Sequence, residues 1–111
     1  MNAASSVKAA RKEREGTMLD MVLANAAALR EGLAPLGATS VSVFGSVARR
    51  AERSDSDVDI LVDLEPDVGL FALLRMQGLA EKILGRPVDL MSRADLKDNV
   101  ARNILEDEIR L

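Results

Sequence analysis

The sequence lacks two residue types on which many active sites depend, because none of its 111 residues is cysteine or histidine. Without cysteine there can be no disulfide framework, no thiolate metal site and no thiol nucleophile. Without histidine the chain cannot build a Ser-His catalytic pair, and the usual zinc sites made from histidine and cysteine are excluded as well. Carboxylates must therefore carry any catalytic chemistry.

Aromatic residues are almost missing too, since the chain has two phenylalanines and no tyrosine or tryptophan. Its core must be aliphatic, and it cannot offer the series of aromatic platforms on which single-stranded nucleic acids stack. The net charge of −3 also disfavours a phosphate backbone as ligand, because such binding relies on a basic surface. Direct nucleic-acid binding is therefore not expected.

Long apolar runs are absent as well. No stretch approaches the roughly 20 apolar residues that span a bilayer, and the N-terminus lacks the continuous apolar core of a signal peptide. We therefore expect no membrane insertion and a cytoplasmic location. With 48% apolar and 30% charged residues, residues 1–111 are expected to form a single globular domain. Residues 1–17 are expected to be a polar arm or the start of an N-terminal helix.

What the chain does contain is a regular spacing of aliphatic residues. Apolar side chains recur every three or four positions over 18–36, over 69–84 and again from 93 onward, which predicts three amphipathic helical regions. Gly37 and Gly85 follow the first two regions directly and are typical helix stops. The chain therefore has a substantial helical component.

Strands are predicted between these helices. Residues 40–44 alternate between polar and apolar, 58–63 is a run rich in β-branched residues, and 87–91 is predicted to be a short third strand. The order of elements indicates an α/β fold in which helices pack on a small mixed β-sheet. The helices that start at Met18 and Arg93 carry more apolar surface than a small chain can easily cover, so a partner surface is expected on them.

Two aspartates at the start of the second strand are the first candidate site. Alternate side chains of a strand point to the same face, so Asp57 and Asp59 project together, about 6 to 7 Å apart along the backbone. Their repulsion is relieved if a cation binds between them, and Mg²⁺ prefers such oxygen ligands. The alternative is a solvated strand end. Asp63 has the same parity but lies roughly 13 Å from Asp59, too far to share an ion, and Asp55 is interpreted as a turn residue.

A Gly-Ser pair after the first strand is the second candidate site. Gly45 lets the backbone approach a ligand closely, and if residues 47–50 begin a short helix, their amides form an anion-binding nest that the Ser46 hydroxyl can join. The alternative is an ordinary turn with a helix cap. The guanidinium of Arg49 suits bidentate phosphate binding, but an ion pair with a nearby carboxylate is an equal alternative.

Together these segments resemble a known family. Gly45 to Arg49 reads Gly-Ser-Val-Ala-Arg, and 56–59 reads Ser-Asp-Val-Asp, which is similar to the signature of the minimal nucleotidyltransferases of the polymerase-beta superfamily. The resemblance implies a third carboxylate on a neighbouring strand, and Asp89 in a Val-Asp-Leu sequence occupies that position. Arg50 stands where the family usually has glycine, so either the turn differs or its φ angle is negative.

The resemblance also implies an activity. Asp57, Asp59 and Asp89 would be the catalytic residues and hold two Mg²⁺ ions, while Gly45, Ser46 and Arg49 would bind ATP. Small members of the family resemble antitoxins that attach AMP to a hydroxyl, typically of a tyrosine, on an all-helical HEPN-type ribonuclease toxin.

Two other interpretations of this resemblance stay open. In the first, the same fold neutralises a partner by binding alone, without catalysis. In the second, the chain modifies a small molecule such as an aminoglycoside. This second interpretation is less favoured, because such enzymes generally carry an additional substrate domain.

Overall fold

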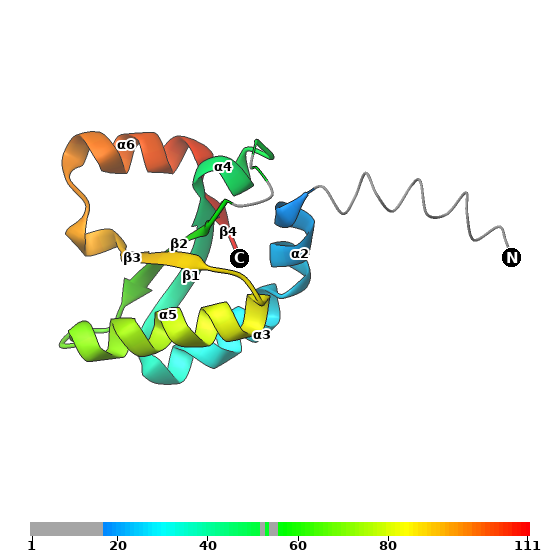
Figure 1. Cartoon of the computed structure of the whole chain (residues 1–111). Helices are drawn as coiled ribbons and strands as arrows, with labels where there is room; N and C mark the ends of the chain where they lie inside the picture. The colour runs from blue at the N-terminus through cyan, green and yellow to red at the C-terminus, as the bar shows by residue number, and fades with distance from the viewer. Residues whose placement is uncertain (1–16, 52, 54–55) are drawn as a thin grey trace, which may run out of the picture.

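A four-stranded sheet forms the centre of the computed structural model, which describes residues 17–51, 53 and 56–111 (Figure 1). The sheet order is β3-β2-β1-β4. β2 is parallel to β3, and β1 is antiparallel to both β2 and β4. The predicted mixed sheet with packed helices is thus confirmed. The strands are β1 (Ala38–Phe44), β2 (Val58–Leu64), β3 (Val88–Ser92) and β4 (Ile109–Arg110).

The N-terminal helical region is divided in two. The helices α2 (Met18–Ala24) and α3 (Ala26–Leu33) are separated at Asn25, and the 3₁₀ turn η1 (Ala34–Leu36) follows. The single helix predicted over 18–36 is therefore wrong. Asn25 has φ −104° and ψ 13°, and its side-chain Nδ2 donates to the Met21 carbonyl at 2.9 Å. An asparagine side chain competes in this way with the backbone ladder of a helix. The prediction for 1–16 lies outside the described residues.

The predicted stop at Gly37 is confirmed, since its φ of 114° is accessible to glycine at little cost. The helix after β2 is confirmed as well. It is α5 (Leu70–Leu84), and Gly85 ends it with a φ of 68°. α5 connects the parallel strands β2 and β3, as expected for strands that cannot be joined by a tight turn.

The C-terminal region differs from the prediction at both ends. A 3₁₀ turn, η2 (Arg93–Asp95), precedes α6 (Asp98–Asp107), so the helix begins later than residue 93. Ile109 and Arg110 form β4 and pair with Val43 and Ser42 of β1. The strand exists because it satisfies the edge of β1, a tertiary cause that helical periodicity does not reveal. No helix in the described part of the chain is long and apolar enough to cross a membrane.

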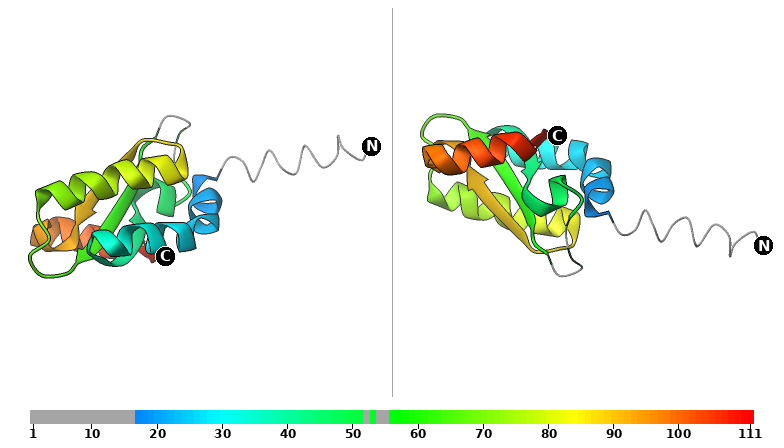
Figure 2. Two further views of the ribbon diagram at one scale, coloured as in Figure 1. Left: turned by 90° about the horizontal axis from the view of Figure 1, so that it is seen from below. Right: turned by 90° about the horizontal axis from the view of Figure 1, so that it is seen from above.

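Helices cover both faces of the sheet. Seen from below in Figure 2, α3 and α5 lie across one face, and seen from above α6 lies across the other. The larger core lies between the sheet and α2, α3 and α5, and is aliphatic as predicted. Phe44 and Leu61 of the sheet form a smaller cluster with Ile104 of α6. Because side chains alternate along a strand, Asp57 and Asp59 share the α6 face with Leu61.

Candidate active site

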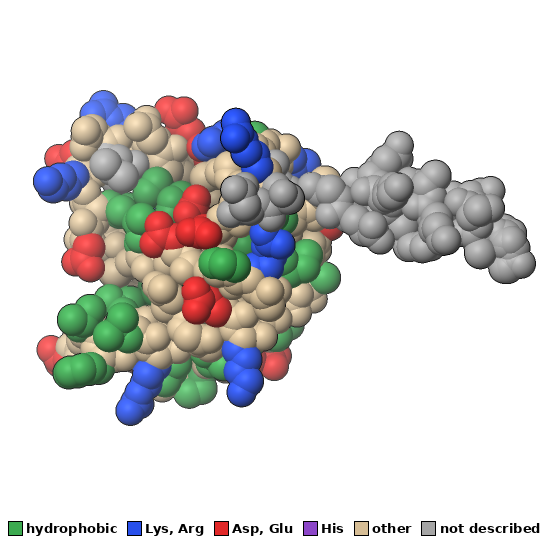
Figure 3. All heavy atoms as spheres, in the orientation of Figure 1, with side chains coloured by type: hydrophobic (Ala, Val, Ile, Leu, Met, Phe, Trp, Pro, Cys, Tyr) green, Lys and Arg blue, Asp and Glu red, His purple; other side chains and the backbone are tan. Residues whose placement is uncertain are grey.

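The three predicted carboxylates meet at the amino ends of the parallel strands. Asp59 is the second residue of β2 and lies opposite Asp89, the second residue of β3. Asp57 directly precedes β2. Asp57 and Asp89 are exposed, whereas Asp59 is half-buried. Figure 3 shows acidic side chains gathered on this face of the molecule between α4 (Gly45–Ala48) and β3. The structure thus brings together the residues that the sequence selected.

The neighbouring charges shift the pKa of Asp59 electrostatically. Burial raises the pKa of Asp59 above its usual range, and repulsion from Asp89 and then Asp57 raises it further. The positive charge of Arg49 acts in the opposite direction and lowers this pKa. Both neighbouring carboxylates are therefore close enough to Asp59 to destabilise its ionised form. A bound cation would remove that cost.

Gly45 has a structural role that the sequence interpretation missed. It follows β1 with a φ of 73°, and a Cβ added there would overlap the Oδ2 atom of Asp59. Its neighbour in β1, Phe44, lies opposite Asp59 in the antiparallel register. The absence of a side chain at Gly45 therefore makes the space in which the Asp59 carboxylate lies.

A short helix is present, but α4 spans Gly45–Ala48, so it begins two residues before the predicted start at Val47 and includes Ser46 in its first turn. The amide of Arg49 donates to the carbonyl of Gly45 at 3.1 Å, and the amide of Arg50 donates to that of Val47 at 3.1 Å. The amides that precede them, in the first turn of α4, have no carbonyl acceptor within the helix. Within the described residues the Ser46 hydroxyl makes no hydrogen bond. These donors adjoin the aspartates, and their binding to phosphate stays a prediction.

Arg49 forms the ion pair that was one of its two sequence interpretations. Its Nη1 atom lies 2.7 Å from Oδ2 of Asp107, the last residue of α6. Half of the Arg49 side chain is exposed, and its charge also acts on Asp59. Arg49 thus lies between the aspartates and α6. The partner, Asp107, was not predicted because its position depends on how α6 packs.

Arg50 adopts the conformation that glycine adopts readily. Its φ is 57°, so the alternative of a negative φ is wrong. The left-handed region costs a residue with a side chain about 1–2 kcal/mol. Arg50 also pairs with Asp20 of α2 at 3.1 Å, through exposed side chains that contribute little. The chain keeps a left-handed turn after Arg49 at some cost in stability.

A second charged group lies at the other end of β2. Arg93 Nε contacts Asp63 at 2.8 Å, and its two terminal nitrogens donate to Glu108 at 2.9 and 2.5 Å. The hydroxyl of Ser40 donates to Asp63, and the hydroxyl of the fully buried Ser42 donates to Glu108 at 2.5 Å. Asp63 therefore has a structural role at its strand end and, as predicted, does not join the site.

The pKa values of this second group follow from its hydrogen bonds. The hydrogen bond from Arg93 lowers the pKa of Glu108 despite its burial, and the Ser42 hydroxyl adds to the effect. Burial alone would raise the pKa of Asp63, but hydrogen bonds from Ser40 and Arg93 bring it below its usual range. The hydrogen bond to Glu108 is the main cause that raises the pKa of Arg93. The sequence interpretation missed this group because it joins residues far apart in the chain.

The fit of Mg²⁺ can be tested on these residues. Asp57, Asp59 and Asp89 offer only hard oxygen donors, and their mutual repulsion favours a cation. Among the residues that the structure describes, no three acidic side chains lie so that together they could hold a metal ion. Mg²⁺ commonly takes only one or two carboxylates and completes its shell with water and substrate phosphates, so its fit does not depend on three protein ligands for one ion.

Fold and site together define a class of protein, and comparison with known proteins agrees. Residues 27–111 match the nucleotidyltransferase domain, and the chain belongs to this family. It is similar to protein adenylyltransferase MntA of Thermococcus cleftensis, with 37% identity over 73 residues that cover 66% of this chain and 74% of the relative. The assignment to the nucleotidyltransferase enzymes is therefore confirmed.

Solved structures support the same fold. A minimal nucleotidyltransferase superposes with a TM-score of 0.76 and 36% identity, over 84% of this chain and 95% of that one. A toxin–antitoxin structure with AMP-PNP superposes with a TM-score of 0.65 over 83% of this chain and 70% of that one. Its identity is 16%, so this second likeness concerns the fold alone.

Proposed function

We propose that this chain is a Mg²⁺-dependent protein adenylyltransferase that transfers AMP from ATP to a hydroxyl group of a partner protein. The observation that carries the proposal is the convergence of Asp57 and Asp89 on Asp59, whose carboxylate lies in the space left by Gly45. Without a cation, Asp89 and Asp57 destabilise the ionised form of Asp59. Such a cost is common at functional sites.

The comparisons support the choice of nucleotide and acceptor class. The Thermococcus relative is named a protein adenylyltransferase, and the toxin–antitoxin structure that shares the fold contains AMP-PNP. We therefore assign ATP as the donor and a toxin protein as the acceptor, and the family resemblance leads us to propose that this toxin is of the HEPN type. A tyrosine hydroxyl is the proposed acceptor, and the chain acts as the antitoxin of the pair.

Asp57, Asp59 and Asp89 would hold two Mg²⁺ ions, as in other enzymes that transfer nucleotidyl groups. When bound, Mg²⁺ supplies positive charge that offsets the charge developing on the phosphates. Asp57 and Asp59 serve both ions in this proposal, and Asp89 serves the second. The role of the carboxylates is to fix these positions relative to the triphosphate.

The remaining residues bind and orient the substrates. Gly45 and Ser46 hold the terminal phosphates through amides and the serine hydroxyl, and Arg49 exchanges Asp107 for a phosphate oxygen. The acceptor hydroxyl oxygen then bonds to the α-phosphorus while the bond to pyrophosphate breaks. The hydroxyl proton passes to Asp89. Positioning of the two reactants accounts for much of the rate in such transfers.

Calorimetry of ATP binding with Mg²⁺ and with EDTA tests the proposed site. Because the clustered carboxylates repel a triphosphate, we expect ATP to bind with Mg²⁺ and to weaken by at least about tenfold in EDTA. Asp63→Asn is the matched control, since Asp63 shares the strand and the face but not the site. Equal ATP affinity in both buffers would contradict a cation-bridged site and reduce the Gly-Ser segment to an ordinary turn.

A further inference from the structure

Three large, exposed hydrophobic side chains lie together at the start of α5. Phe71 is 81% exposed, Leu70 67% and Leu74 57%. Residues three and four apart are neighbours on a helix surface, so Leu74 adjoins both of the others. Leu105 on α6 is 58% exposed and Leu23 on α2 is 42% exposed. The partner surface expected on the outer helices stays a prediction, and Leu70, Phe71 and Leu74 are called the α5 patch.

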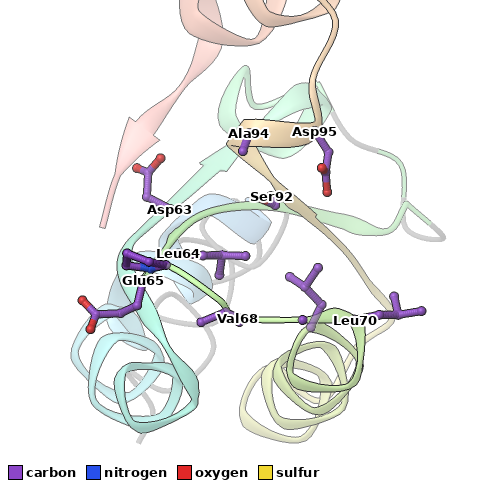
Figure 4. Close-up of a pocket in the computed structure, with 11 residues that line it drawn as sticks. Asp63, Leu64, Glu65, Val68, Leu70, Ser92, Ala94 and Asp95 are labelled. Carbon is purple, nitrogen blue, oxygen red and sulfur yellow. The ribbon is translucent and has the colours of Figure 1, made fainter.

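A cleft of about 530 Å³ adjoins the α5 patch. It lies between the loop after β2, the start of α5 and the turn η2, and in Figure 4 the Leu64 side chain points toward its middle. Its apolar lining comes from Leu64, Val68, Leu70, Leu73 and Ala94. A cleft of this size accommodates one or two large apolar side chains. Because Leu70 belongs both to the α5 patch and to the lining of the cleft, the two form one continuous surface.

The edge of this surface is acidic. Asp95 reaches from η2 toward the cleft, and Glu65 lies at the opposite edge and points outward (Figure 4). Asp67, in the same loop as Glu65, is exposed. Within the described part of the chain none of these three carboxylates forms an ion pair. Asp63, which also lines the cleft, is already paired with Arg93.

We infer that the α5 patch and its cleft dock a segment of a partner protein that carries aliphatic or aromatic anchors flanked by lysine or arginine. The anchors would fill the cleft and cover Phe71, and the basic residues would face Glu65, Asp67 and Asp95. A second copy of this chain fits less well, because it would bring the same carboxylates and a net charge of −3 to the contact.

This surface lies away from the proposed catalytic aspartates. The cleft lies where β2 and β3 end, at Leu64 and Ser92, whereas Asp59 and Asp89 lie where these strands begin. Along an extended strand this is a separation of roughly 10–17 Å. A docked partner would leave the aspartates open to ATP and to an acceptor hydroxyl. This inference rests on the proposed function in one respect, because the proposed function supplies the partner protein that the binding test uses.

The test measures the affinity of the full chain for the product of the neighbouring gene. Phe71→Ser should weaken the complex at least about tenfold, as for a central aromatic anchor. The charge reversals Glu65→Lys and Asp95→Lys together should weaken it similarly and reduce its dependence on salt. The matched controls are Leu105→Ser and Glu106→Lys on α6, which should leave the affinity unchanged. Weakening by the α6 variants with no effect of Phe71→Ser would overturn the inference.

The two proposals fail in distinguishable ways. A complex that depends on Phe71 but receives no AMP would refute the proposed function and leave the docking surface intact. If the neighbouring product does not bind, a synthetic amphipathic peptide with leucine anchors and lysine flanks replaces it as the probe. Amide shifts confined to the cleft, and absent with a glutamate-flanked peptide, would support the inference. Shifts elsewhere, no shifts, or self-association through α5 would refute it.

Discussion

Gly45 is the residue at which a single side chain would disturb the site most directly. In Gly45→Ala the added Cβ meets the Asp59 carboxylate, so that carboxylate must move away from Asp57 and Asp89. We expect loss of nucleotidyl transfer by about two orders of magnitude, because catalysis depends on the placement of groups within a fraction of an ångström. Single-turnover assays of the folded variant measure this loss.

Gly85→Ala is the matched control for this variant. Gly85 also has a positive φ, 68°, but an added Cβ there meets nothing within 4 Å. Both variants should lose about 1–2 kcal/mol of stability from the left-handed backbone. Only Gly45→Ala should lose activity. Similar activity in the two variants would show that the space beside Asp59 does not matter.

Asp59 itself should reduce the stability of the free protein. Its pKa is raised in the folded state by burial and then by Asp89 and Asp57. When folding raises the pKa of a carboxyl group, the protonated group contributes stability to the folded state. This contribution is fully present below the group's ordinary pKa of about 4, and it is lost as the pH rises through the pKa of the folded state. Asp59→Asn should therefore unfold at a higher temperature than the wild type at neutral pH in EDTA.

The advantage of Asp59→Asn should shrink toward about pH 4 and below, where the wild-type carboxyl is protonated as well. Thermal unfolding across this pH range measures the change. Asp63→Asn should show the reverse sign, since hydrogen bonds hold the pKa of Asp63 below its usual range. A neutral-pH midpoint for Asp59→Asn below that of the wild type would contradict the repulsion described for the site.

At the scale of elements, Arg93 connects the end of β2 to the chain segment after α6 through Asp63 and Glu108. In Arg93→Gln both carboxylates lose their charged partner, and we expect a loss of about 2 kcal/mol. Because the pKa values of both carboxyls are lowered, their contribution is present above about pH 4 and is lost as the pH falls. Urea unfolding at several pH values tests both statements.

The control for Arg93→Gln is Arg75→Gln on the exposed side of α5, which should be nearly neutral. The acid lability of the wild type should also be smaller in Arg93→Gln, since Arg93 contributes to both lowered pKa values. If Arg93→Gln were as stable as the wild type, the contacts of Arg93 with Asp63 and Glu108 would not contribute to stability.

Elements with a strong local pattern were predictable from the sequence. The period-two strand before Gly45 and the apolar face of α5 were found, because burial of one face determines both patterns. The break at Asn25 and the strand at Ile109 were not found. The first depends on one side chain that bonds to the backbone, and the second on the free edge of a strand distant in the sequence.

The same distinction applies to the site. Asp57 and Asp59 share a face because strands alternate, so their proximity followed from spacing, and Asp89 followed from family resemblance. The space that Gly45 leaves for Asp59 and the pairing of Arg49 with Asp107 depend on packing between elements. The exposure of the α5 patch also depends on tertiary packing, because a helical stripe alone does not say which of its residues stay uncovered.

For the molecule as a whole, single substitutions assign roles within the proposed catalytic group. Asp89→Asn should resemble changes at Asp57 and Asp59, since Asp89 is proposed to hold the second ion and accept the hydroxyl proton. Asp63→Asn should transfer AMP nearly as well as the wild type, because its partners are Arg93 and Ser40. Full activity of Asp89→Asn would show that the third carboxylate is misassigned.

The most direct measurement compares the wild type with the Asp57→Asn, Asp59→Asn double variant in transfer of label from ATP to the neighbouring gene's product with Mg²⁺. These changes keep the shape of both side chains and remove their charge. We predict that the double variant folds and binds the partner but loses transfer by several orders of magnitude, and that its protection against the toxin falls as well. Full protection by a variant that transfers no AMP would contradict catalysis and identify a module that acts by binding alone.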